Sequence, residues 1–183
     1  MEVKGSAIKS TSEFVKKYFT KDYTDWFNSL DKETQDIIEN TSVSKWYSIK
    51  EGLIHPTQKI IEHFYDNDIK GAYETGRYSA DSGLNGIYKF FIKIGSPSFI
   101  ISKSASVFGT YYKNAIMTVI SKTSTSVILD ISNFPEYHIL IEHRVIGWIE
   151  KALELSGCKN IKTNIVKSIY SNDNSTELFI TWE

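Results

Sequence analysis

The chain has 183 residues, 41% of them hydrophobic and 23% charged, with a formal net charge of −1. This composition is typical of a single globular domain with a substantial core, and it excludes a disordered chain. A net charge this close to zero gives no general electrostatic attraction to nucleic acids or to anionic membranes.

The sequence also carries no sign of secretion or of membrane insertion. Cys158 is the only cysteine, so an intrachain disulfide is impossible. No window approaches the roughly 18 apolar residues of a membrane span, and the N-terminus lacks the apolar run of a signal peptide. We therefore expect a cytoplasmic protein with no membrane span.

Helical patterns dominate the first 109 residues. Ser10 and Glu13 have capping-box spacing and predict a helix that continues to about Tyr18. Asp31 is the expected N-cap of a short helix that ends near Asn40, and Pro56 is the expected first residue of another. These signals predict several short helices rather than strands.

Glycines punctuate the next helical stretch, which covers residues 69–94. Gly76, Gly83 and Gly86 each cost about 1 kcal/mol relative to alanine inside a helix, which predicts close packing or a break there. Gly95-Ser96-Pro97 should end this helix and begin another, which Gly109 should close.

The last third of the chain is rich in β-forming residues on either side of one helix. Two hairpins are predicted, in Asn114–Ile131 and Asn160–Trp182. Between them, Pro135–Ser156 carries an apolar stripe at helical spacing. The stripe consists of Ile141, Val145, Ile149 and Leu153. Gly157 is the expected C′ residue of this helix.

The predicted fold class is therefore α+β. N-terminal helices should pack on a four-stranded antiparallel sheet of ββαββ order, with strands only from the two hairpin regions. We expect one domain over residues 1–183, in which residues 1–109 form a mainly helical part and residues 110–183 form the ββαββ part.

Aromatic side chains between the N-terminal helices and the first strand suggest an apolar pocket with a few polar anchors, the usual form of a small-molecule site. The alternative is an ordinary core with tyrosines at its rim. Arg77 and Arg144 could bind an anionic ligand, or they could form surface salt bridges to Glu74 or Glu142. An enclosed arginine without an internal carboxylate would indicate a ligand. The predicted ligand-binding residues are Tyr73, Arg77, Phe91, Tyr112, Arg144 and Trp148.

Evidence for catalysis or for a metal is weak in this sequence. His138 and Glu142 are four residues apart on one helix, but two ligands leave a metal under-coordinated. The chain has no His-Glu-x-x-His motif and no Gly-x-Ser-x-Gly elbow. We therefore expect neither catalytic residues nor a metal site, while the pair His138 and Glu142 stays open.

A family resemblance begins at Trp46. The chain resembles an uncharacterised family of bacterial proteins, first noted in myxobacteria, that is distantly similar to vinyl-reductase domains, haem-NO-binding sensors and TRAPP vesicle-tethering subunits. The matching features are Trp46-Tyr47, Glu74-Thr75-Gly76-Arg77, Gly95-Ser96-Pro97, Gly147, Ser156-Gly157 and Phe179-Ile180-Thr181-Trp182. The resemblance implies helices packed against a four-stranded antiparallel sheet.

The chain departs in two places from the families that it resembles. Haem-NO-binding sensors hold the porphyrin propionates with a Tyr-x-Ser-x-Arg motif, of which the comparable stretch here, residues 141–144, keeps only Arg144. Cys158 alone cannot reproduce the C-terminal cysteines that are proposed as metal ligands in vinyl-reductase domains. We therefore expect no haem and no other cofactor.

The function predicted from the sequence is a non-enzymatic small-molecule-binding or sensory domain. Its apolar pocket should lie between helices and sheet, and its ligand should be a small apolar molecule or an acyl or aromatic acid. The alternative is a homodimeric, TRAPP-like adaptor that binds no ligand and associates through its helices.

Overall fold

Four strands from the last third of the chain form one antiparallel sheet in the computed structural model, which describes residues 1–84 and 97–183. The strands are β3 (Ile116–Lys122), β4 (Ser126–Ser132), β5 (Lys162–Lys167) and β6 (Thr176–Thr181), in the spatial order β3-β4-β6-β5. The register pairs Val127 with Ile180 and Leu129 with Leu178, which places buried side chains on one face. The predicted α+β class and ββαββ order are confirmed.

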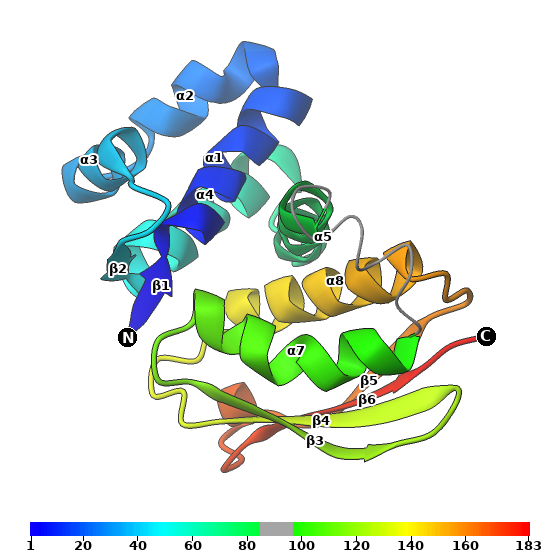
Figure 1. Ribbon diagram of the computed structural model, residues 1–183. Helices are drawn as coiled ribbons and strands as arrows, with labels where there is room; N and C mark the ends of the chain where they lie inside the picture. Colours follow the sequence, from blue (N-terminus) through cyan, green and yellow to red (C-terminus); the bar gives the residue numbers. More distant parts are fainter. Residues whose placement is uncertain (85–96) are drawn as a thin grey trace.

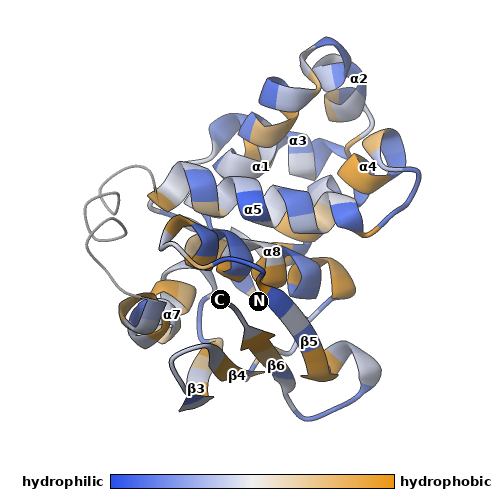
Figure 2. Ribbon diagram, turned by 90° about the vertical axis from the view of Figure 1, so that its right-hand side faces the viewer, coloured by the Kyte–Doolittle hydropathy of each residue, from blue (hydrophilic) through white to orange (hydrophobic). Residues whose placement is uncertain are grey.

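Two helices cover that face of the sheet (Figure 1). They are α7 (Pro97–Tyr111) and α8 (Ile139–Leu155). All four residues of the predicted stripe on α8 are buried, and hydrophobic residues also run along β4 and β6 (Figure 2). Gly157 has a φ of +100° after α8, as expected of a C′ glycine. The helix α7 continues past Gly109 to Tyr111, because Gly109 lies on its exposed side and meets no neighbour.

A second group of helices lies beyond α8, on the side away from the sheet (Figure 1). It consists of α1 (Gly5–Tyr18), α2 (Tyr23–Asn28), α3 (Lys32–Asn40), α4 (His55–Phe64) and α5 (Lys70–Leu84), with short helical turns at Thr20–Asp22 and Lys50–Ile54. A third turn, Ile169–Ser171, precedes β6. Asp31 caps α3 as predicted, because its Oδ1 accepts a hydrogen bond of 2.8 Å from the Thr34 N–H. The helix α1 begins at Gly5, earlier than the capping-box spacing at Ser10 predicts.

A small two-stranded sheet was not predicted from the sequence. It pairs β1 (Glu2–Lys4) with β2 (Trp46–Ser48) in antiparallel register. Val3 of β1 pairs with Tyr47 of β2, is completely buried, and also forms an isolated bridge to Tyr112. Strands of three residues are too short to show an alternating pattern, so the prediction of strands only after Gly109 holds for the four-stranded sheet alone.

The two groups of helices meet where α5 crosses α8, and glycines permit the contact. A Cβ added to Gly76 would lie 2.1 Å from the carbonyl oxygen of Arg144. A Cβ added to Gly147 would lie 2.1 Å from the carbonyl oxygen of Tyr73. The two backbones therefore touch, which confirms the close packing predicted at Gly76. Gly86 lies outside the described residues.

The apolar interior of the described residues forms two main clusters. The larger one joins the sheet to α7, α8 and β1. The smaller one lies among the N-terminal helices, and its buried members are Phe14, Val15, Trp26, Leu30 and Ile60. Among the described residues, no helix combines the length and apolar character needed to cross a membrane.

Candidate functional site

A cavity of about 330 Å³ lies between α7, α8 and the inner face of the sheet. Its wall is built mainly from apolar side chains, with few polar groups. It is lined by Leu84, Phe99, Ile100, Ile101, Lys103, Ser104, Ser106, Val107, Thr110, Val127, Leu129, Trp148, Ile149, Ala152 and Leu153. The volume falls within the roughly 300–1,000 Å³ of small-molecule sites, and the predicted position between helices and sheet is the one observed.

A second, smaller cavity of about 40 Å³ adjoins the first. The two cavities share a wall of four side chains, Ser104, Val107, Trp148 and Ile149. The smaller one is lined by a buried cation, Arg144, together with Tyr111 and Tyr112, whereas the cation on the wall of the larger one, Lys103, is exposed. Its size suits one or two water molecules or a single small polar group.

Arg144 is buried, whereas a surface salt bridge was one of the two arrangements expected from the sequence. Only 3% of its surface is exposed, and Nη1 donates hydrogen bonds to Thr75 Oγ1 at 2.6 Å and to Thr57 Oγ1 at 3.3 Å. The expected salt bridge to Glu142 is absent among the described residues. Glu142 accepts hydrogen bonds from Ser168 and Thr176 instead. Burial lowers the pKa of Arg144 to about 10, so the group stays protonated at neutral pH.

Two aromatic residues of the predicted site line the smaller cavity beside Arg144. Tyr112 follows α7 and is 8% exposed, whereas Trp148 lies on α8 and lines both cavities. The Trp148 Nε1 atom is buried and has no hydrogen-bond partner among the described residues. A buried donor without a partner is costly, and such groups usually mark an absent water or ligand atom.

The other predicted site residues lie elsewhere. Tyr73 donates a hydrogen bond of 2.6 Å to Glu150, which ties α5 to α8. Arg77 pairs with Glu154 and lines an open cleft between α1 and α5. Neither Tyr73 nor Arg77 lines the two apolar cavities. Phe91 lies outside the described residues.

Several residues that contact Arg144 or line the cavities were not predicted from the sequence. Thr57 and Thr75 are 87 and 69 residues away from Arg144 in the chain, and an isolated threonine in a helical pattern gives no signal of its partner. Val107 and Ile149 could be assigned to a core from their apolar character, but not to the wall between two cavities.

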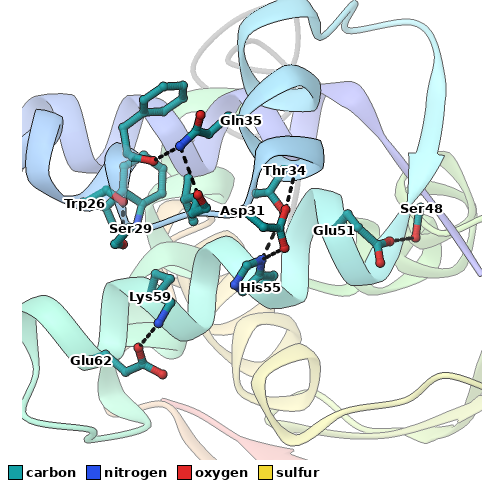
Figure 3. A network of polar contacts seen from close by, with 12 residues as sticks. Trp26, Ser29, Asp31, Thr34, Gln35, Ser48, Glu51, His55, Lys59 and Glu62 are labelled. Carbon is teal, nitrogen blue, oxygen red and sulfur yellow. Dashed lines mark hydrogen bonds and ion pairs between the residues drawn. The ribbon is translucent and has the colours of Figure 1, made fainter.

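A polar cluster in the N-terminal helices is a second candidate site (Figure 3). Asp31 Oδ2 lies 2.8 Å from His55 Nδ1, and Thr34 Oγ1 lies 3.1 Å from the same nitrogen. A nucleophile-activating histidine must bind its two partners through opposite ring nitrogens. Because both contacts share Nδ1, the cluster fastens α3 to α4 and does not form a catalytic relay.

His138 and Glu142 also have ordinary protein partners. His138 caps α8, where its Nδ1 accepts a hydrogen bond of 3.2 Å from the Leu140 N–H. Glu142 is buried and accepts a bond of 2.6 Å from Ser168 Oγ. Among the described residues, no group of three or more histidine, cysteine, aspartate or glutamate side chains is placed to hold a metal ion.

The burial of Tyr112 predicts a change of stability at alkaline pH. Burial raises the pKa of Tyr112 to about 12 from the ordinary value of 10.0. The folded protein therefore favours the neutral phenol, and the stabilisation is complete below pH 10 and is lost as the pH rises towards 12. We expect the free energy of unfolding of Tyr112→Phe to fall less steeply over this range than that of the wild type, measured by urea unfolding at several pH values.

Other groups titrate in the same range, so the comparison with the variant is essential. Tyr65 and Tyr73 also have pKa values raised to about 12, mainly by burial, and Arg144 changes stability in the opposite direction. These groups are present in both proteins. Equal slopes for the wild type and Tyr112→Phe would show that Tyr112 ionises as readily in the folded state as in the unfolded state.

Comparison with known proteins identifies the architecture. No protein-family model and no curated protein matches the chain. Among solved structures, the chain is similar to an H-NOX protein from S. oneidensis in the Fe(II)NO ligation state, with a TM-score of 0.74 and 12% sequence identity over 98% of this chain and 99% of that one.

Two further solved structures agree with this match. An unliganded Fe(II) H-NOX mutant from K. algicida has a TM-score of 0.72 and 13% identity, covering 98% of this chain and 96% of that one. The IWP-051-bound H-NOX from Shewanella woodyi has a TM-score of 0.68 and 14% identity, covering 97% and 93%. The predicted resemblance in fold to haem-NO-binding sensors is confirmed. The chain therefore has the fold of the H-NOX domains.

Proposed function

We propose that this chain is a non-enzymatic sensory domain that binds a small organic molecule in the cavity between α7, α8 and the sheet. The observation that carries the proposal is that cavity itself, about 330 Å³ in volume and walled mainly by apolar side chains. Burial of apolar ligand surface would supply the binding free energy. The ligand is a small apolar molecule or an acyl or aromatic acid.

The fold suggests haem as a candidate ligand, since one of the similar structures concerns haem distortion in the H-NOX family. The residues present do not fit it. Protein ligands of haem iron are His, Cys, Met or Tyr, and none of these residue types is found among the described residues that line the larger cavity. The smaller cavity has Tyr111, Tyr112 and Met117, but its volume is only about 40 Å³. None of the four histidines of the chain lines either cavity.

Absence of haem is therefore part of the proposal. We expect protein refolded or titrated with haemin to show no saturable Soret band at one equivalent. A strong band that disappears when His63 or His143 is replaced would contradict this expectation, and it would reassign the domain to haem binding.

Filling the larger cavity tests the ligand-binding proposal directly. Val107 is half-buried on the wall between the two cavities, and a phenylalanine there would occupy ligand space. We expect Val107→Phe to weaken binding of straight-chain alcohols and carboxylic acids by about tenfold or more, measured by calorimetry and by the thermal midpoint. Native mass spectrometry of freshly purified protein would reveal a copurified ligand.

A matched control is available on the same helix. Ala105 is exposed on α7 and lines neither cavity, so Ala105→Phe should bind the probes as the wild type does. If no alcohol or acid binds and no ligand copurifies, the proposal fails. If both variants bind equally, the ligand occupies another site.

One observation favours the alternative, a homodimeric adaptor without a ligand. In both ribbon views no helix of the described residues covers the second face of the sheet (Figures 1 and 2). Ile116, Ile120 and Val166 on its edge strands are 48%, 59% and 54% exposed. The predicted helical interface has less support, since Tyr18 is the only large hydrophobic residue exposed on a described helix. If the chain has this function, the wild type should be a dimer in analytical ultracentrifugation, and Ile120→Lys should be a monomer.

A further inference from the structure

Arg144 is a buried cation without an acidic partner. Its guanidinium hydrogen-bonds the neutral hydroxyl groups of Thr57 and Thr75. No described ion pair includes it, and residues 85–96 contain neither aspartate nor glutamate. A buried charge is ordinarily retained only with a counter-charge, because desolvation otherwise destabilises the folded state. The protein itself does not supply that counter-charge.

The space beside Arg144 has the size and the donors of a head-group site. The cavity of about 40 Å³ is lined by the arginine and by Trp148, whose buried Nε1 lacks an acceptor among the described residues. Both groups donate hydrogen bonds, and neither carries a negative charge. The molecule that completes this cavity must therefore supply acceptors, and a negative charge satisfies Arg144 best.

The position of this cavity relates it to the larger one. Ser104, Val107, Trp148 and Ile149 line both, so the two cavities adjoin along these side chains. An apolar chain in the larger cavity and an anionic head in the smaller one would together satisfy every feature described above. A planar carboxylate matches the fork of a guanidinium and is small enough for the space.

We propose that the ligand is an organic monocarboxylic acid, with its carboxylate paired to Arg144, its second donor supplied by Trp148 Nε1, and its apolar tail in the larger cavity. This inference rests on the proposed ligand-binding function and decides between the two ligand classes left open there. Because burial leaves the pKa of Arg144 at about 10, the guanidinium is charged at neutral pH, where the acid is ionised.

Matched pairs of probes test the inference. Butanoic, hexanoic, octanoic and decanoic acids would be compared with the alcohols of the same chain length by calorimetry. We expect the best acid to bind about tenfold or more tightly than its alcohol. If neither series binds, the proposed function fails. If acid and alcohol bind equally well, the proposed function stands and the carboxylate inference is overturned.

Variants at the head-group site provide a second readout. Arg144→Met keeps an unbranched but shorter side chain and removes the charge, so it should still bind the alcohol and lose the preference for the acid. Without ligand, we expect its thermal midpoint to be unchanged or raised, because an unpaired buried charge is removed. An Arg144→Met protein that keeps the preference for the acid would overturn the inference.

A milder variant keeps the test decisive if Arg144→Met does not fold. Trp148→Phe removes the indole N–H together with part of the ring system, and it keeps an aromatic ring in the wall. It should weaken binding of the acid severalfold, and by a larger factor than it weakens binding of the alcohol. Lys9→Met, on the exposed surface of α1, is the control for loss of a positive charge and should leave both affinities unchanged. An equal effect of Lys9→Met and Trp148→Phe would contradict the proposed contact.

Discussion

Gly147→Ala is expected to lower the free energy of unfolding by more than about 4 kcal/mol, or to prevent folding. The added Cβ would lie 2.1 Å from the carbonyl oxygen of Tyr73, and the nearest neighbours are all backbone atoms. Backbone atoms of two packed helices cannot move aside as a flexible side chain can. The helices α5 and α8 would have to separate, and the cores on either side would separate with them. Chemical denaturation followed by circular dichroism would measure the loss.

Gly109→Ala is the control for this experiment. Gly109 also lies within a helix, but an added Cβ would meet no atom within 4 Å. The substitution removes the conformational freedom of a helical glycine and should raise the free energy of unfolding by up to about 1 kcal/mol. The two substitutions are chemically identical, so opposite signs would isolate the contact between helices. A mild effect of Gly147→Ala, below about 1 kcal/mol, would mean that the helices are not in backbone contact.

Trp26→Ala should have the second-largest effect, a loss of about 3–5 kcal/mol. The Trp26 side chain is completely buried in the smaller apolar cluster, and its Nε1 donates to the carbonyl oxygen of Pro56 at 3.4 Å. We further expect the loss to destabilise the whole chain, because α1 is fastened to α5 by the Ser10–Ser79 hydrogen bond of 3.1 Å and α5 is fastened to α8. Residues 1–183 would then unfold as the single domain predicted from the sequence.

Two spectroscopic signals would show whether the unfolding is cooperative. Circular dichroism follows all of the helices, whereas the fluorescence of Trp26→Ala comes from Trp46, Trp148 and Trp182, of which the last two lie in the half that contains the four-stranded sheet. Coincident transitions in Trp26→Ala and in the wild type would support one domain, and a fluorescence transition that stays at the wild-type midpoint would indicate two. Trp46→Ala is the control, since Trp46 is only half-buried beside the small sheet and its loss should cost less.

The predictability of the fold depended on the length of each element. The four-stranded sheet and α8 could be predicted because β3, β4 and the stripe on α8 are long enough to show their periods. The strands β1 and β2 are three residues each and show none. The start of α1 at Gly5 was missed because it is set by a hydrogen bond of 3.0 Å from the Gly5 N–H to the Lys45 carbonyl, a distant contact.

The position of Arg144 could not be predicted from α8 alone, for a different reason. An amphipathic helix with one apolar stripe is expected to expose its opposite face. In this protein α5 covers that opposite face, because Gly76 and Gly147 allow the two helices to touch. A polar residue at the edge of the stripe is therefore enclosed between two layers. The aromatic residues Tyr112 and Trp148 were easier to assign, since their size and apolar character favour burial in any arrangement.

Contact between the backbones of α5 and α8 also has a mechanical consequence. Because no side chain separates the helices at Gly76 and Gly147, the distance between them at that point cannot shorten. The two helices can then move relative to each other only by rotating about this crossing, which acts as a fulcrum. Trp148, beside this fulcrum, lines both cavities. A ligand that displaces Trp148 would therefore tilt one layer against the other, with the largest travel at α2 and α3, which lie farthest from the sheet (Figure 1). Binding of a ligand in the cavity would then change the position of α2 and α3.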